Sequence, residues 1–186
     1  DSPYMVMDNG EMQEKKSIKS LILDNLSEYG DYKEYLANEN VYREKWLKPL
    51  LLSVEYFEND KKDFMPIERD LQIEHILPTS WKAEKSWDGV PLKWKESFDD
   101  AQAENLKNSL GNLTLLSGKK NIEASNCNFD QKIDIYKGNS GKGFDGKVSF
   151  EITKSIIDDY ARWTPEEIAQ RCINLEQKID NILKID

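Results

Sequence analysis

The chain has 186 residues, and 33% of them are charged, which suits one soluble domain with a hydrophobic core. No apolar run approaches the length of a membrane-spanning helix and no basic-then-apolar leader opens the chain, so we expect no membrane partner. The net charge of −9, taken alone, argues against a nucleic-acid partner, because polyanions attract Lys and Arg. The chain starts at Asp1 without an initiator Met, and we expect it to be part of a longer protein.

The two cysteines, Cys127 and Cys172, are isolated and form no Cys-x-x-Cys pair. Structural zinc sites draw their ligands from closely spaced cysteines and histidines. We therefore expect no structural zinc. Isolated thiols indicate a reducing compartment, and we expect a cytoplasmic protein.

Residues 1–70 predict an N-terminal helical segment. Residues 1–10 show no periodicity, and we expect a loose end there. From Glu11 to Tyr29 apolar residues recur at helical spacing, and Gly30 is a typical helix terminator.

A second helical stretch covers residues 31–57 and is interrupted around residues 38–40. Pro49 falls inside the pattern, where it would kink the helix or occupy its first turn. Aromatic residues on this stripe, including Tyr42 and Trp46, are interpreted as core residues.

The segment from Leu71 to Leu77 carries apolar residues at alternate positions, which predicts a strand. His75 is the only histidine of the chain and lies near the end of this strand. Pro78 ends the strand, because proline cannot donate to a ladder.

A second strand is predicted at Leu113–Leu116, directly after a turn at Gly111-Asn112. Residues 118–125 predict a short helix that contains Asn121. Residues 71–140 are therefore interpreted as a unit of two strands and a helix.

The remaining segments are predicted from local signals. We expect a mixed loop at 81–94, a polar helix at 95–110 and a helix around 129–136. Residues 141–186 predict a glycine-rich loop followed by helices. The last helix starts at residues 164–167, where a Thr cap precedes Pro and Glu.

The unusual residues suit phosphodiester hydrolysis. That reaction needs a base that activates water and a cation that stabilises charge on the phosphate and the leaving oxygen. Histidine suits the first role, because its unperturbed pKa lies near neutrality. Mg²⁺ or Mn²⁺ suits the second and prefers carboxylate and amide oxygens, so Asn and Glu make sense as ligands.

Spacing brings these residues together in a hairpin. His75 ends one strand and Asn112 opens the other, so we expect them side by side. Asn121 lies nine positions after Asn112, far enough to enter a helix packed on the hairpin. Glu74 and His75 point to opposite faces of a regular strand, and both serve one site only if the strand twists or breaks.

The segment Ile73–Pro78 resembles the acid-His-Ile-Val-Pro segment of HNH nucleases, also called ββα-metal or His-Me finger nucleases. Residues 112–121 resemble their Asn-x-x-x-Leu-x-x-x-x-Asn segment. Residues 110–136 and the helix start at 163–171 are similar to the C-terminal nuclease domain of GmrSD-type restriction enzymes. The resemblance covers about residues 71–175.

This resemblance implies a metal-dependent endonuclease that cuts DNA in bacterial defence against foreign, often modified, DNA. By position it implies that His75 is the general base and that Asn112 orients the His75 loop. It implies Asn121 as a metal ligand and Glu74 as a candidate second one, with Mg²⁺ or Mn²⁺ as the metal. It also implies a separate N-terminal nucleotide-hydrolysing domain or subunit as a partner. The last two positions of the HNH pattern are Asn here, not His.

Positive charge gathers locally within residues 119–147, where six lysines stand against four acidic residues. A local patch can bind phosphates on an acidic protein. Lys119, Lys120 and Lys132 are therefore predicted to contact DNA. The alternative for these lysines is a solvated helix face.

Together these features predict an α+β, predominantly helical domain. A small ββα-metal core (71–140) lies between an N-terminal helical segment (1–70) and a C-terminal loop and helices (141–186). Two other functions stay open: an HNH-like module that binds nucleic acid or a partner without cutting, and a helical protein-interaction scaffold. DNA and RNA also stay open as substrates. The structural alternatives for the site residues are a core or surface histidine, a turn residue, a helix-surface amide and a solvent-facing carboxylate.

Overall fold

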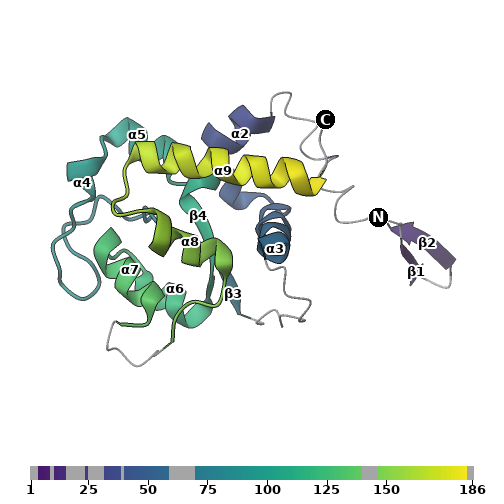
Figure 1. The fold of residues 1–186 in the computed structure, drawn as a ribbon, viewed down its shortest axis with the longest axis horizontal. Helices are drawn as coiled ribbons and strands as arrows, with labels where there is room; N and C mark the ends of the chain where they lie inside the picture. Colours follow the sequence, from purple (N-terminus) through teal and green to yellow (C-terminus); the bar gives the residue numbers. More distant parts are fainter. Residues whose placement is uncertain are drawn as a thin grey trace.

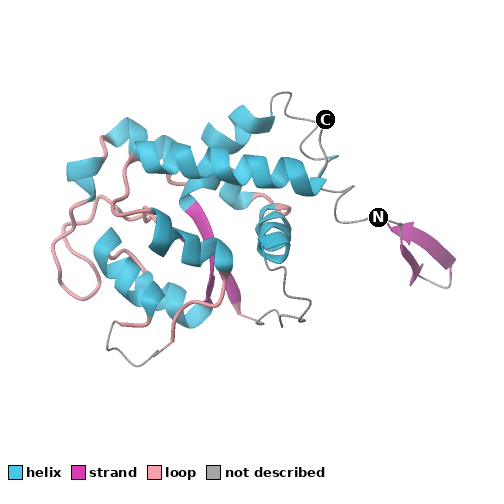
Figure 2. Cartoon of the chain, viewed as in Figure 1, coloured by secondary structure: helices cyan, strands magenta, loops and turns pink. Residues whose placement is uncertain are grey.

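Helices predominate in the computed structural model (Figure 2), and the described strands form two separate two-stranded antiparallel sheets. The predicted class, an α+β fold that is mainly helical, is confirmed. Within the described residues no helix combines the length and apolarity needed to cross a membrane. The structure describes residues 4–8, 11–15, 24, 32–38, 40–58, 70–139 and 146–183.

The N-terminal end is a hairpin and corrects two predictions. β1 (Tyr4–Asp8) pairs antiparallel with β2 (Glu11–Lys15), so neither a loose end nor a helix starting at Glu11 is right. The dipeptide Asn9-Gly10 between the strands is a strong hairpin signal, and it outweighs the weak helical spacing after it. Of residues 16–29, only Asp24 lies among the described residues, and it is helical.

The second helical stretch folds largely as predicted. It consists of α2 (Tyr32–Asn38), the short 3-10 helix η1 (Val41–Arg43) and α3 (Leu47–Glu58). Pro49 occupies the first turn of α3, where its missing N–H costs no helical hydrogen bond. The face of α3 that carries Leu47, Leu50, Leu51 and Val54 is fully buried.

The central hairpin has the predicted strand order. β3 (Leu71–His75) pairs antiparallel with β4 (Leu113–Ser117), and the register sets His75 opposite Leu113. α6 (Gly118–Ala124) follows β4 without a linker. The chain therefore forms a strand–strand–helix unit, with the first strand ending at His75.

The connection between the two strands contains two helices rather than the single one predicted at 95–110. α4 (Trp94–Ser97) ends where Phe98 turns extended, and Asp99 then opens α5 (Asp100–Leu106) with a capping box that includes Gln102. The 3-10 helix η2 (Leu110–Asn112) leads into β4.

The C-terminal part supplies three helices. α7 (Phe129–Lys137) ends at Gly138, whose φ of 78° is in the left-handed region that favours glycine. α8 (Glu151–Asp159) is the first of the helices predicted within residues 141–186. α9 (Pro165–Leu183) begins where the Thr-Pro-Glu-Glu signal predicts it.

The central hairpin separates two hydrophobic clusters. Leu71, Leu113 and Leu115 join α3 and α9 on one face, whereas Leu116 on the other face joins α6, α7 and α8. Figure 1 shows this arrangement, with α3 and the helices α6 to α8 on different sides of β3 and β4 and α9 crossing the molecule. On β3, Leu71 and Ile73 therefore face the first cluster, whereas Glu74 points to the opposite side, toward α7.

Candidate active site

His75 closes β3 and is held between two other segments. Its Nε2 lies 2.9 Å from Oδ1 of Asn108, in the turn after α5. Its ring centroid lies 4.2 Å from that of Tyr42 in η1, with the two rings tilted by 54°. With the Asn108 oxygen facing the ring, Nε2 carries the hydrogen and donates it. Nδ1 is then the unprotonated nitrogen.

The surroundings of His75 favour the neutral imidazole. Burial, with a smaller contribution from the positive charges of Lys132 and Lys107, lowers the pKa of His75 from its ordinary 6.5 to about 4. The hydrogen bond to Asn108 opposes this shift by favouring the protonated ring. At neutral pH the ring is therefore uncharged, which is the form that accepts a proton.

Asn112 is fully buried and ties the chain after His75 in place. Its Oδ1 accepts from the N–H of Leu77 at 2.7 Å and from Nε1 of Trp163 at 3.0 Å. Its Nδ2 donates to the carbonyls of Leu77 and Lys107 at 2.9 and 2.8 Å. All four bonds are inside the molecule, so Asn112 adjoins the His75 loop; its part in catalysis stays a prediction.

The residues around Asn112 explain why glycine precedes it. A Cβ at Gly111 would lie 2.2 Å from the backbone oxygen of Ile168 in α9. Arg171, one turn further along α9, donates from Nη1 to the carbonyls of Gly111 and Leu113, both at 2.8 Å. α9 thus packs directly on the backbone that carries Asn112, and only glycine allows that approach.

Glu74 points away from His75 and is engaged elsewhere. Its Oε1 accepts from Nζ of Lys132 at 2.5 Å and from the hydroxyl of Tyr136 at 3.1 Å. β3 is paired residue by residue through His75, so the strand has no break that would turn both side chains to one side. The prediction of Glu74 as a metal ligand does not fit, because a metal there would face an ammonium group.

Two of the three lysines predicted to contact DNA are corrected by burial. Lys132 is 0% exposed, and besides Glu74 its Nζ donates to the carbonyl of His75 at 2.6 Å. Lys120 is 8% exposed and donates to the carbonyl of Ile135 at 2.8 Å. Neither ammonium group is available to a phosphate. Lys119 is exposed, and its contact with DNA stays a prediction.

Asn121 lies on the other face of β3 from His75. Its Nδ2 donates to Oε1 of Gln72 at 2.7 Å, and Gln72 alternates with His75 along the strand. Its Oδ1 is buried without a hydrogen-bond partner, and an amide oxygen in that state suits a hard cation. Among the described residues no three His, Cys, Asp or Glu side chains gather as a metal-binding group.

Tyr42, Lys107 and Asn108 complete the surroundings of His75, and no sequence pattern predicts any of the three as a site residue. The helical spacing predicts Tyr42 to be a core residue, yet Tyr42 is 40% exposed. Asn108 lies 33 positions from His75 in a polar stretch without any pattern. Its position four residues before Asn112, at the end of the inter-strand connection, is the only local signal for it.

Over residues 26–177 the sequence matches the family described as GmrSD restriction endonucleases, C-terminal domain. The chain belongs to this family. No curated protein matches it. The GmrSD match starts well before β3 and includes α2, η1 and α3, so Tyr42 lies within it. The family makes this chain a restriction endonuclease domain, which implies DNA as the substrate.

Proposed function

We propose that this GmrSD C-terminal domain is an HNH-type, metal-dependent DNA endonuclease in which His75 is the general base. The observation that carries the proposal is the pairing of His75 with Asn108, because it leaves a neutral ring with Nδ1 unprotonated. A base needs that state before it can take a proton from water.

The roles of the neighbouring residues follow from their contacts. Nδ1 of His75 takes a proton from the water that attacks the phosphorus, and the ring becomes an imidazolium. Oδ1 of Asn108 accepts the hydrogen of Nε2 and stabilises the positive charge that forms. Asn112 holds the backbone at Leu77, and Lys132 holds the carbonyl of His75. The ring is thereby aimed before substrate arrives.

Mg²⁺ or Mn²⁺ is the cofactor of this proposal. When bound, such a cation supplies charge stabilisation at the phosphate and at the leaving oxygen. Asn121 fits as one donor, because its Oδ1 is buried and has no hydrogen-bond partner. Glu74 is left out, because Lys132 and Tyr136 hold its Oε1.

The wider role of the domain is proposed from the family. GmrSD restriction endonucleases suit cytoplasmic defence against foreign or modified DNA. A nucleotide-hydrolysing N-terminal domain or subunit is the partner that we expect for such an enzyme. The chain itself supplies the cutting step in this proposal.

A non-catalytic DNA-binding module is the second candidate. One observation favours it: Asn121 contacts Gln72 on the face of β3 away from His75. The proposed base and the proposed metal donor therefore lie on opposite faces of the strand. In that case the buried polar residues around the hairpin would serve stability alone.

Plasmid nicking separates the two candidates. Purified protein, with its partner domain present, is incubated with supercoiled DNA and Mg²⁺ or Mn²⁺, with and without EDTA. We expect metal-dependent nicking by the wild type, a loss of about a hundredfold or more in His75→Ala, and full activity in the exposed control Asn139→Ala. Equal nicking by His75→Ala would exclude the proposed base.

A further inference from the structure

An exposed aromatic and basic segment adjoins His75, and no sequence motif assigns a function to it. The segment follows α2 and comprises η1 and the turn after it. Val41 and Trp46 anchor it, with exposed fractions of 0% and 5%. Between these anchors Tyr42, Arg43 and Lys45 are exposed. Buried anchors with exposed polar residues between them present a fixed surface rather than a loose tail.

Tyr42 links this surface to the candidate base. Its ring is in contact with the ring of His75, with the centroids 4.2 Å apart, while 40% of the residue remains exposed. A hydrophobic core aromatic would be covered on all sides. The ring of Tyr42 instead borders both His75 and solvent, so a nucleotide that packs on it would lie next to the candidate base.

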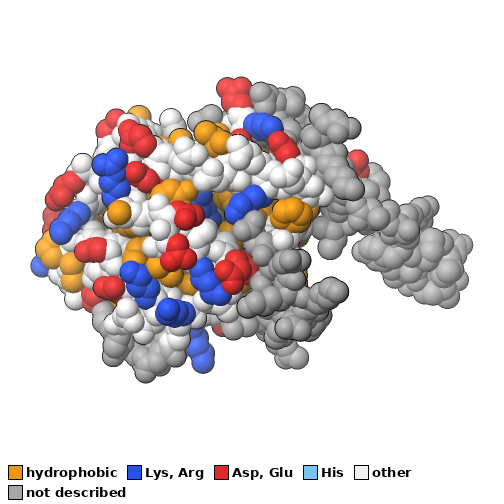
Figure 3. Space-filling view, in the orientation of Figure 1, with side chains coloured by type: hydrophobic (Ala, Val, Ile, Leu, Met, Phe, Trp, Pro, Cys, Tyr) orange, Lys and Arg blue, Asp and Glu red, His pale blue; other side chains and the backbone are white. Residues whose placement is uncertain are grey.

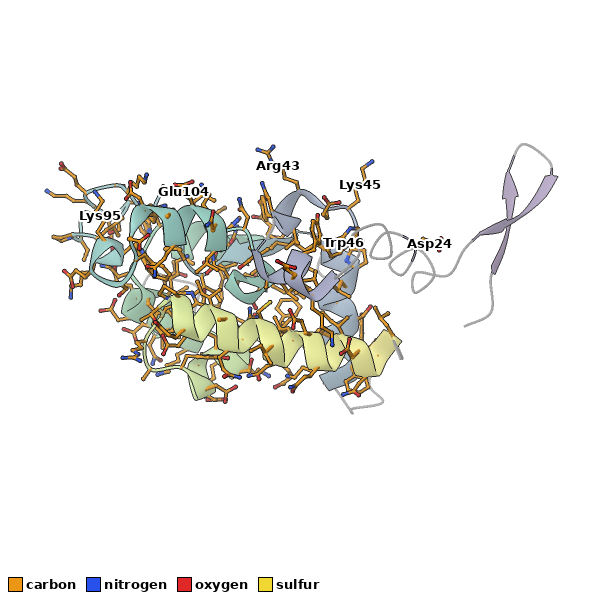
Figure 4. The ribbon with its side chains drawn as sticks, turned by 90° about the horizontal axis from the view of Figure 1, so that it is seen from above. Asp24, Arg43, Lys45, Trp46, Lys95 and Glu104 are labelled. Atoms are coloured by element: carbon orange, nitrogen blue, oxygen red, sulfur yellow. The ribbon has the colours of Figure 1, made fainter. Side chains whose placement is uncertain are left out.

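Two exposed cations, Arg43 and Lys45, lie beside Tyr42 in the chain. Neither Arg43 nor Lys45 forms an ion pair with any residue that the structure describes, whereas Lys82, Lys107 and Arg162 each do. Figure 4 shows Arg43 and Lys45 extending outward from the same edge of the molecule, away from α9. On the face shown in Figure 3, by contrast, acidic and basic side chains are interspersed.

We propose that Tyr42, Arg43 and Lys45 bind the DNA strand that is cut, with Arg43 and Lys45 on its phosphates and the Tyr42 ring against a nucleotide next to the scissile phosphate. Unpaired cations beside an exposed aromatic are the combination with which proteins hold a nucleic-acid strand. Arg43 and Lys45 thus replace the buried Lys120 and Lys132 as the proposed phosphate contacts. The inference rests on the proposed function and names the contacts that bring substrate to His75.

The binding test compares two pairs of substitutions that remove the same charge. Arg43→Gln/Lys45→Gln alters the proposed surface, and Lys95→Gln/Lys147→Gln removes two exposed cations from elsewhere on the domain. Affinity for a fluorescent DNA duplex is measured by anisotropy in EDTA at several salt concentrations, and circular dichroism checks the fold. We expect about a tenfold or greater loss for the first pair, a salt slope lower by about 1.8, and less than a twofold change for the second.

Tyr42 has its own pair of variants. Tyr42→Phe retains the ring and is expected to bind DNA as the wild type does, whereas Tyr42→Ala is expected to bind about five- to tenfold more weakly. Equal losses of DNA affinity in the two double variants, or no loss of DNA affinity in any variant, would overturn the proposed surface. So would an intact DNA affinity combined with lost association to the rest of the enzyme, since the segment would then be a protein interface.

Cleavage assays on the same variants separate this inference from the proposed function. If the wild type binds DNA through Arg43 and Lys45 but does not cut, the nuclease proposal fails and the binding surface stands. If the wild type cuts and Arg43→Gln/Lys45→Gln retains its kcat/KM, the surface fails and the nuclease proposal stands.

Discussion

His75 and Asn108 are joined by a hydrogen bond of 2.9 Å between Nε2 and Oδ1. The bond connects the end of β3 to the turn after α5, two segments that the sequence separates by 33 positions. It makes Nδ1 the unprotonated nitrogen of a neutral ring, and the proposed chemistry depends on that nitrogen.

Changing Asn108 should move the pH profile of cleavage. In Asn108→Asp a carboxylate replaces the amide oxygen and favours the imidazolium, so the pKa of His75 rises and the acidic limb of the rate–pH profile moves to higher pH. Asn108→Ala removes the acceptor and should lower kcat by about ten- to a hundredfold. Single-turnover rates across pH measure both effects. Asn139→Asp, at an exposed asparagine, controls for the added charge. If the acidic limb of the rate–pH profile did not move in Asn108→Asp, the proposed role of Asn108 would be contradicted.

The lowered pKa of His75 should also appear in the stability of the fold. The ring binds a proton near pH 6.5 in the unfolded chain and at about pH 4 in the folded one. The unfolded state therefore binds more protons between these values, and falling pH lowers stability in that window. Urea unfolding at pH 7 and pH 4.5 should show the wild type losing about 2–3 kcal/mol more than His75→Gln. Equal losses of unfolding free energy in the wild type and His75→Gln would mean that the pKa of His75 in the folded protein lies near its ordinary value.

Lys132 should behave as a structural residue. Lys132→Met leaves the buried Glu74 carboxylate without its ammonium partner, and breaking a buried pair costs about 3–5 kcal/mol of unfolding free energy. Urea unfolding measures this loss. In the double variant Glu74→Gln/Lys132→Met the unpaired charge is gone, so part of the stability should return. If Lys132→Met had wild-type stability but bound DNA more weakly, the result would support the phosphate contact predicted for Lys132 from the sequence.

Gly111 should tolerate no side chain. In Gly111→Ala the new Cβ would lie 2.2 Å from the backbone oxygen of Ile168, so α9 must shift, at a cost of about 1–3 kcal/mol or more. Gly146 is a matched control, because a Cβ there meets no atom within 4 Å. The thermal unfolding midpoints of the two variants are compared. Equal midpoints would show that α9 does not pack on Gly111.

Local patterns predict those parts of the fold that depend on neighbours in sequence. Alternation at Leu71–Leu77 and the cap at Thr164 predict β3 and the start of α9, and the Asn112 turn predicts where β4 opens. The hairpin at the N-terminus is missed although Asn9-Gly10 marks it, because the apolar residues after it also recur at helical spacing.

Burial of charged residues escapes prediction for a physical reason. Lys132 and Glu74 are 58 positions apart, and each alone resembles a solvated side chain. Only the packing of α7 on the hairpin pairs them. Tyr42 is the opposite case, since its helical spacing is typical of a core residue, while its place in η1 leaves it at the surface beside His75.

Chemical rescue of His75→Gly tests the proposed base most directly. The variant is assayed for DNA cleavage with Mg²⁺ or Mn²⁺ while imidazole is added to the medium, since a free imidazole can take the place of the missing ring. We predict that cleavage is lost and then returns in proportion to the neutral imidazole present. Cleavage by His75→Gly at the wild-type rate without imidazole would contradict the role of His75.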